Sequence, residues 1–275
     1  MKMRTVRRHL SSYLVWIVVL VVAYFPLFWL VTGSLKVLGQ QMAIPPIWLP
    51  HPPTHTNWLA FFKDPLSAGA IYNSLVVTLA SVFFSFLLGI PAAYSLTRFR
   101  VGSGVILIII MLVRMIPPNA FMVPLFVIST QLGLHDTRFM LTLVYLLFIL
   151  PVTIWFLLGF ISQIPIELEE CARMEGCSQL SVIWHIILPL IGPGLAALAV
   201  LVMTMTWNEF PLALVLTSRN SRTLPVMVNL FVSARSIEWG PMCAAGIFSA
   251  LPIVVFGIAV QKFLVRGLMA GAVKE

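Results

Sequence analysis

The sequence predicts an all-α polytopic membrane protein with six transmembrane helices, and two observations support this fold class. The 275 residues are 60% hydrophobic and 9% charged, with a mean hydropathy of +1.01, whereas soluble domains average about 45–50% apolar residues. Six apolar runs also reach the roughly 20 residues that a helix needs to cross a bilayer. Spanning segments must satisfy their backbone polar groups internally, which favours helices. The predicted spans are Tyr13–Thr32, Ser74–Leu96, Val105–Val127, Phe139–Ile161, Ile186–Trp207 and Ala244–Leu264.

The charges around these spans predict that both termini are cytoplasmic. Lys2, Arg4, Arg7 and Arg8 precede the first span, as in a signal peptide. Its apolar run, however, exceeds the usual length of about 7–15 residues, and no small-x-small cleavage site closes it, so we expect an uncleaved anchor. With the N-terminus inside, ten Lys and Arg residues lie in the cytoplasm and six lie outside. The net charge of +8 therefore reflects membrane topology and not a nucleic-acid partner.

The connections between the spans differ in length and composition. Residues 33–70 form a proline-rich external segment in which NWLAFF, residues 57–62, predicts a short interfacial helix. Residues 99–104 are a short basic cytoplasmic turn, and residues 131–138 and 218–241 are external. We expect one transmembrane domain over residues 1–275.

The connection between the fourth and fifth spans, about residues 162–185, is the charged exception in this apolar chain. It contains four of the nine acidic residues within nine positions: Glu167, Glu169, Glu170 and Glu175. We call this segment the hook. On the predicted topology it lies in the cytoplasm.

Local signals predict a helix–turn–helix within the hook. Pro165 suits the first position of a helix. The acidic residues in the following turn are stabilised there by the positive end of the helix dipole. Gly176 is expected to end that helix, and Ser178 to cap a second one. Pro189, with Gly192-Pro193-Gly194, is expected to bend the chain back into the fifth span.

An amphipathic loop resting on lipid headgroups is the alternative interpretation of the hook. Helices at the lipid surface are usually rich in Lys and Arg, whereas this segment is rich in Glu. Its acidic face should repel anionic lipid. The composition therefore favours a surface on which a protein partner docks.

The spacing of residues in the hook resembles the EAA loop of ABC importer permeases. The family pattern has E-A-A, then a glycine, then I-x-L-P, and here it reads Glu170-Cys171-Ala172, Gly176 and Ile186-Ile187-Leu188-Pro189. Cys171 replaces an alanine of the pattern. The resemblance implies a set of ATPase-coupling residues: Glu170, Cys171, Ala172, Arg173, Glu175, Gly176, Ile186, Leu188 and Pro189.

Other segments are similar to carbohydrate-importer permeases, and especially to the second, shorter permease subunit of maltose-type importers. These segments are FPLFWLVTGSLK, GIPAAYSLTRFR, WNEFPLALVLT and RGLMAGAVKE. The resemblance implies a multi-pass protein of the bacterial inner membrane, with a second homologous permease, two ATPase subunits docked at the hook, an external solute-binding protein and a carbohydrate or polyol substrate. It also implies no cofactor in this chain, because ATP and Mg²⁺ are bound by the ATPase. The sequence agrees, since it contains no G-x-x-x-x-G-K-[ST] phosphate loop.

Polar residues near the membrane interior are candidates for a translocation pathway. A charge in a span is costly, so Arg114 should face a cavity or a partner. The candidate residues are Arg114, Asn119, Trp207, Asn208 and Glu209. These groups could instead satisfy one another or backbone exposed around the prolines. Three cysteines at irregular spacing predict neither a disulfide framework nor a metal site.

Two other classes of function fit the sequence less well. An ion-coupled secondary transporter would need carboxylates inside its spans, and no acid lies there. An intramembrane enzyme would need a metal motif or a cluster of catalytic side chains, and neither is apparent, so we expect a non-catalytic transport subunit. The sequence does not identify the solute.

Overall fold

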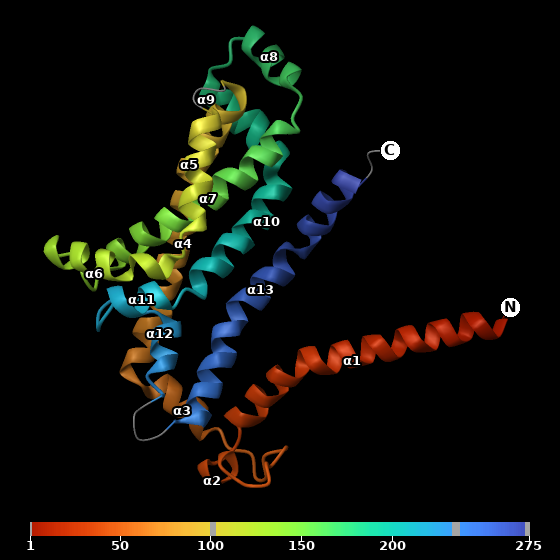
Figure 1. Ribbon diagram of the computed structural model, residues 1–275, viewed down its shortest axis with the longest axis vertical. Helices are drawn as coiled ribbons and strands as arrows, with labels where there is room; N and C mark the ends of the chain where they lie inside the picture. The colour runs from red at the N-terminus through yellow and green to blue at the C-terminus, as the bar shows by residue number, and fades with distance from the viewer. Residues whose placement is uncertain (1, 100–102, 233–236, 273–275) are drawn as a thin grey trace. The chain divides into compact units, whose positions relative to one another are not determined.

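The computed structural model describes the backbone of residues 2–99, 103–232 and 237–272, and in these ranges the chain is helical without any strand (Figure 1). The side chains of residues 2–12, 14, 103, 111, 114 and 262–272 lie outside the described part. The helices are α1 (Lys2–Ser34), α2 (Leu38–Gln41), α3 (Thr56–Lys63), α4 (Pro65–Arg98), α5 (Ser103–Met115), η1 (Pro118–Phe121), α6 (Met122–Gln131), α7 (Arg138–Ser162), α8 (Ile166–Met174), α9 (Gln179–Val182), η2 (Ile183–Ile187), α10 (Leu188–Trp207), α11 (Pro211–Leu216), α12 (Leu224–Asn229) and α13 (Trp239–Ala272).

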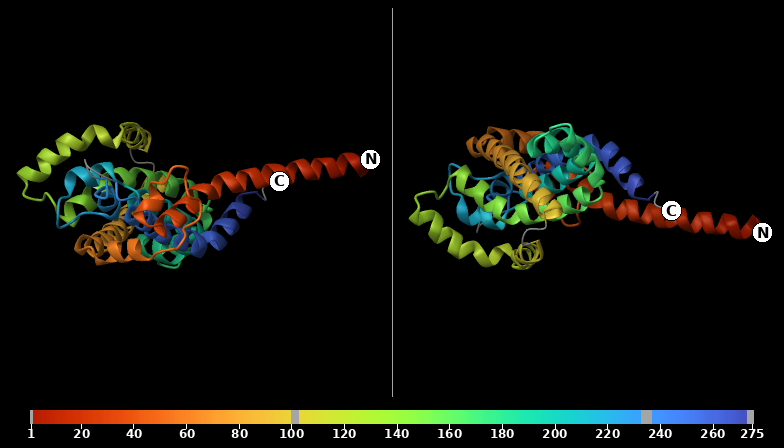
Figure 2. Two further views of the ribbon diagram at one scale, coloured as in Figure 1. Left: turned by 90° about the horizontal axis from the view of Figure 1, so that it is seen from below. Right: turned by 90° about the horizontal axis from the view of Figure 1, so that it is seen from above.

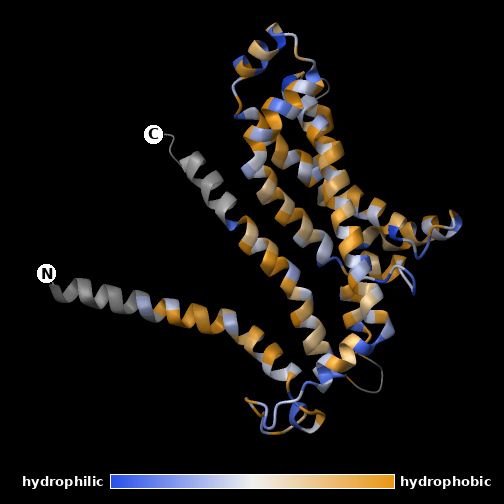
Figure 3. Ribbon diagram, turned by 180° about the vertical axis from the view of Figure 1, so that it is seen from behind, coloured by the Kyte–Doolittle hydropathy of each residue, from blue (hydrophilic) through white to orange (hydrophobic). Residues whose placement is uncertain are grey.

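Five helical stretches of the described chain are long and apolar enough to cross a membrane. They are Val15–Ser34, Pro65–Arg98, Arg138–Ser162, Gln179–Trp207 and Trp239–Gln261. Each coincides with one of the six predicted spans. Figure 3 shows hydrophobic residues along these helices and hydrophilic residues at the hook.

The third predicted span is not one continuous helix, and this prediction was wrong. Helix α5 ends at Met115, a 3₁₀ turn covers Pro118–Phe121, and α6 then runs in a new direction. Figure 2 shows α5 nearly end on, with α6 lying across the view. The Pro117-Pro118 pair accounts for the break, since Pro118 forces Pro117 into an extended conformation (ψ 132°).

The fifth span begins earlier than predicted, because the helix already runs through Pro189. The chain is helical from Gln179 to Trp207, and a π-helical turn, Ile183–Ile187, comes directly before α10. In a regular α-helix the ring of Pro189 would clash with the carbonyl of residue 185. The wider π turn interrupts the regular ladder at this place, so the helix continues past the proline.

The described chain divides into two compact units, residues 1–67 with 228–251 and residues 68–227 with 252–275. In the first unit, the short helix predicted over residues 57–62 is present as α3. The amide of Asn57 donates to the carbonyls of Ser34 (2.9 Å) and Lys36 (2.8 Å), so it ties α3 to the end of α1. Phe61 packs against Phe248 of α13 with tilted rings whose centroids are 5.7 Å apart. A single domain over the whole chain stays a prediction.

The second unit contains two groups of buried apolar side chains. One lies between α4, α7 and α10 and extends into the hook through Ala172 and Val182. The other joins α7 to α11 and α12 around Leu141 and Leu212. The hook is therefore packed onto the membrane helices through a common apolar core.

Candidate functional site

The ends of α8, the first helix of the hook, lie close to the residues that the sequence predicted. Pro165 is the residue before the helix and not its first residue, with an extended ψ of 133°. At the other end Gly176 has a φ of +89°, the left-handed region that favours glycine. Its N–H donates to the carbonyl of Arg173 (3.0 Å), and the N–H of Cys177 donates to that of Ala172 (3.0 Å). These two bonds form a Schellman motif, so the predicted glycine stop is confirmed.

The second helix of the hook begins at the predicted cap. The hydroxyl of Ser178 accepts a hydrogen bond from the N–H of Ser181 (3.3 Å). From there the chain runs without a break through the π turn into α10. The I-x-L-P part of the motif therefore lies inside this helical run: Ile186 and Leu188 are partly buried and Pro189 is exposed.

The hook has one face packed on the membrane helices and one face open. The open face contains most of the predicted coupling residues, namely Glu170, Cys171, Arg173, Glu175 and Gly176. Of the predicted coupling residues on α8, Ala172 is the buried one, with 8% of its surface exposed. Large apolar side chains are also exposed beside this face, including Met174 (84%) and Leu180 (67%). An acidic surface with exposed apolar residues suits a protein partner more than water or anionic lipid.

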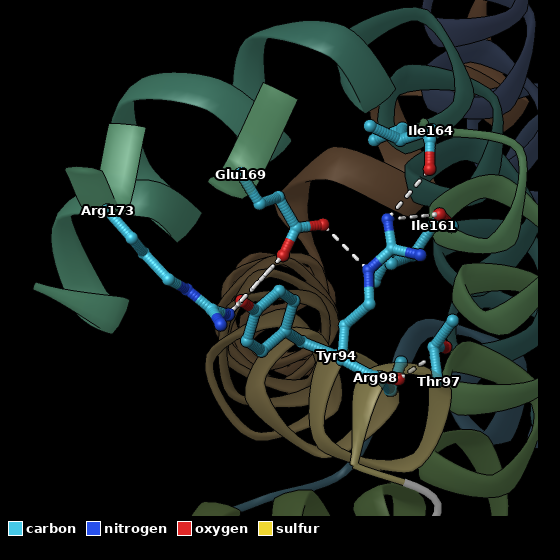
Figure 4. A network of polar contacts seen from close by, with 8 residues as sticks. Tyr94, Thr97, Arg98, Ile161, Ile164, Glu169 and Arg173 are labelled. Atoms are coloured by element: carbon cyan, nitrogen blue, oxygen red, sulfur yellow. Dashed lines mark hydrogen bonds and ion pairs between the residues drawn. The ribbon is translucent and has the colours of Figure 1, made fainter. Parts of the chain in front are cut away.

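Glu169 is the acidic residue that points inward, and it is completely buried. Figure 4 shows its carboxylate between two side chains of α4. Its Oε1 accepts from Arg98 Nε at 2.6 Å, and its Oε2 accepts from the Tyr94 hydroxyl at 2.8 Å. Arg173, one turn further along α8, lies 3.8 Å from Oε2 and also donates to the Tyr94 hydroxyl (3.1 Å). The buried charge is therefore compensated by two cations and a hydroxyl.

Arg98 also binds the end of α7. Its Nη2 donates to the carbonyl of Ile161 in the last turn of α7 (3.2 Å) and to that of Ile164 just beyond the helix (2.9 Å) (Figure 4). One guanidinium thus connects α4, the end of α7 and α8. Sequence reasoning missed this cluster. The available signal was the i, i+4 spacing of Tyr94 and Arg98 at the basic end of a span, facing the hook's charges.

The structure places the predicted pathway residues at the broken third span and at the end of α10. Asn119 is exposed in η1, and the side chain of Arg114 lies outside the described residues. Trp207 is buried, while Asn208 is exposed and donates to the carbonyl of Thr204 (2.9 Å). Their role in translocation stays a prediction.

Glu209, the last of these residues, binds the start of α11. Its two oxygens accept from the N–H groups of Leu212 (2.8 Å) and Ala213 (3.0 Å). Burial raises the pKa of its carboxyl, and the two amide donors oppose that rise. The side chain thus stabilises the turn between α10 and α11, as the alternative interpretation of these polar groups anticipated.

Asp136 joins two connections, and it precedes α7 whereas the hook follows that helix. Its carboxylate accepts from four consecutive backbone N–H groups, those of residues 218–221, at 2.8–3.0 Å. The hydroxyl of Ser221 donates to it as well (2.9 Å). Burial alone would raise the pKa of Asp136, but the four amide donors outweigh burial and hold it well below its ordinary value.

We expect Asp136→Asn to lower the thermal stability at neutral pH and to weaken its dependence on acid. A carboxyl whose pKa is lower in the folded state stabilises the fold above its unfolded pKa of about 4, and that contribution is lost as the pH falls below this value. The measurement is the Tm of the purified protein in detergent from pH 7 to pH 3. Asp64→Asn is the control, because its carboxylate accepts from the backbone amide of Leu66 and not from a run of four successive amides. Equal pH profiles for wild type and Asp136→Asn would contradict this assignment.

The chain was compared with known protein families, proteins and solved structures. Residues 85–269 match the family described as binding-protein-dependent transport system inner membrane component. The chain is 32% identical over 252 residues to the diacetylchitobiose uptake system permease protein DasC of Streptomyces coelicolor, with 91% of each chain covered. It is 34% identical over 261 residues to the trehalose transport system permease protein SugB of Mycobacterium tuberculosis, covering 93% of this chain and 94% of that one.

The fold agrees with that of solved transporters. A chain in the crystal structure of a bacterial ABC transporter involved in the import of the acidic polysaccharide alginate superposes with a TM-score of 0.78. It is 22% identical, and the match covers 92% of this chain and 95% of that one. The chain therefore belongs to the family of inner-membrane components of binding-protein-dependent transport systems, the permease subunits of ABC importers.

Proposed function

We propose that this protein is the permease subunit through which an ABC importer moves a carbohydrate or polyol into the cell by alternating access. The observation that carries the proposal is the two-faced hook, anchored on the membrane helices and open toward a partner. Relatives named for diacetylchitobiose, trehalose and sulfoquinovosyl glycerol support a carbohydrate substrate. The individual solute is the labelled sugar whose uptake is lost in a strain that lacks this chain.

The open face of the hook is proposed to dock on the ATPase. Glu170 offers an exposed carboxylate in the second turn of α8, and Gly176 gives the tight turn between α8 and α9. Cys171 and Glu175 complete the exposed surface around them. Movement of the ATPase subunits would then shift the membrane helices between their inward-open and outward-open states.

The proposed topology has six crossings, with both termini and the hook in the cytoplasm. The basic residues that flank the spans support this orientation. The third crossing would be a discontinuous one made by α5 and the segment around Pro117-Pro118. Broken helices at membrane depth line binding sites or water-filled cavities in transporters, which supports a pathway near Arg114 and Asn119.

The complete transporter is proposed to contain a second homologous permease, two ATPase subunits and an external solute-binding protein. This chain would hold no cofactor of its own. ATP and Mg²⁺ would be bound by the ATPase subunits. Asn208 and Glu209 would lie near the external end of the pathway.

Labelling of Cys171 tests both the topology and the docking surface. We expect an impermeant maleimide to modify this exposed thiol in inverted membrane vesicles and not in right-side-out vesicles, in a Cys177→Ser background in which the remaining Cys243 is buried. Co-expression of the ATPase should lower the modification rate about tenfold, because an interface excludes solvent from its centre.

Ser218→Cys is the matched control, since residue 218 is exposed in a connection that is proposed to be external. It should label in right-side-out vesicles, whether or not the ATPase is present. Modification of Cys171 from the external side, or at the same rate with and without the ATPase, would overturn the proposed docking.

A further inference from the structure

One acidic side chain of the hook behaves differently from the other three. Glu167, Glu170 and Glu175 are exposed, while Glu169 is fully buried with both oxygens occupied. Its partners Tyr94 and Arg98 belong to α4, at sequence distances of 75 and 71 residues. We call these three residues the joint.

The joint holds α8 more firmly than the chain connection does. Only residues 163–165 link α7 to α8, and such a short link leaves backbone torsions about which α8 could turn. Arg98 removes this freedom by binding the carbonyls of Ile161 and Ile164 together with the carboxylate of Glu169. Helix α8 therefore has a fixed position relative to both α4 and α7.

The chemistry of the joint suits this role more than it suits stability alone. A buried ion pair is often no more stable than apolar side chains of the same volume. Apolar contacts, however, allow sliding, whereas charge-assisted hydrogen bonds from a planar guanidinium fix both distance and direction. Tyr94 already belongs to the apolar core that joins α4 to α8 through Ala93 and Ala172. The charged hydrogen bonds thus fix the distance and orientation of α8 relative to α4.

We propose that Glu169 is a positioning residue that makes the hook move as one body with α4 and α7, so that motion of the ATPase reaches the membrane helices. This inference rests on the proposed docking of the ATPase at the hook. Glu169 itself is buried away from the open face and acts through α8. Loss of the joint should leave docking intact and separate ATP hydrolysis from transport.

The test uses Glu169→Gln in the complete transporter, reconstituted in liposomes with its ATPase and solute-binding protein. Glutamine keeps the size of the side chain and removes its charge. We expect the ATPase to co-purify at wild-type ratio and to hydrolyse ATP, while the solute taken up per ATP falls at least about tenfold, as for the loss of a hydrogen bond to a charged group. A wild-type ratio of uptake to hydrolysis would overturn the proposal.

Glu167→Gln is the matched control, because Glu167 lies on the same helix and is exposed. It should change the ratio by less than about twofold, as exposed substitutions usually do. If Glu169→Gln does not accumulate in the membrane, Tyr94→Phe tests the proposal with the same measurements. It removes the hydroxyl that donates to the Glu169 carboxylate. Loss of ATPase co-purification from a folded variant, or an unchanged ratio in Tyr94→Phe, would also overturn the proposal.

Gly176→Asp, a change on the open face, separates this inference from the proposed function. If Gly176→Asp uncouples the transporter while both joint variants remain coupled, only the role of Glu169 fails. If all of these variants transport normally, the docking of the ATPase at the hook fails as well.

Discussion

Gly176→Asp is expected to uncouple ATP hydrolysis from uptake, with at least about a tenfold loss of transport. The backbone at this position has a φ of +89°, and a residue with a Cβ in this region costs about 1–2 kcal/mol, which corresponds to about a tenfold change in an equilibrium. Aspartate also adds a negative charge next to Glu175, on the open face that already carries Glu170. Uptake and hydrolysis measured on the same liposomes give the ratio that tests this expectation.

Gly176→Asn separates the two causes. It has nearly the same shape as the aspartate variant and adopts the left-handed conformation readily, but it brings no charge. An added Cβ meets open space in the free chain, so neither variant should prevent folding. We expect Gly176→Asn to retain more transport than Gly176→Asp. Coupled transport at the wild-type ratio in Gly176→Asp would contradict the proposed seating of the hook.

Arg98→Ala is expected to destabilise the folded protein by about 3–5 kcal/mol, the usual effect of removing one partner of a buried ion pair. The guanidinium side chain is 10% exposed and the carboxylate of Glu169 is fully buried, so water cannot replace the lost partner. The carbonyls of Ile161 and Ile164 lose a donor in the same change. The measurement is the shift in thermal or denaturant-induced unfolding of the purified protein in detergent.

Arg173→Ala is the matched control within the same cluster. Its side chain is 40% exposed and lies 3.8 Å from the Glu169 carboxylate, so the effect should be below about 1 kcal/mol. Equal destabilisation by both substitutions would show that Arg98 is not the main partner of the buried charge.

Much of the membrane fold could be predicted from the sequence because its signals are local. Five of the six predicted spans coincide with long apolar helices, since an apolar run of this length stands out from its flanks. The end of α8 at Gly176 and the cap at Ser178 were also predicted correctly, because both depend on interactions within a few residues. Local reasoning did not anticipate the π turn before Pro189, through which the helix continues past the proline.

The sequence by itself determined that this chain is an apolar helical protein with one acidic hook, and the spacing of Glu170, Gly176 and Pro189 indicated its family. Only the tertiary structure decided which glutamate faces inward and what it binds. Glu167, Glu169 and Glu170 share one helix and one chemistry, and Tyr94 and Arg98 lie more than 70 residues away in the chain. Contacts of this kind arise from the packing of α4 against α7 and α8, and packing between distant segments has no periodicity that a single sequence could reveal.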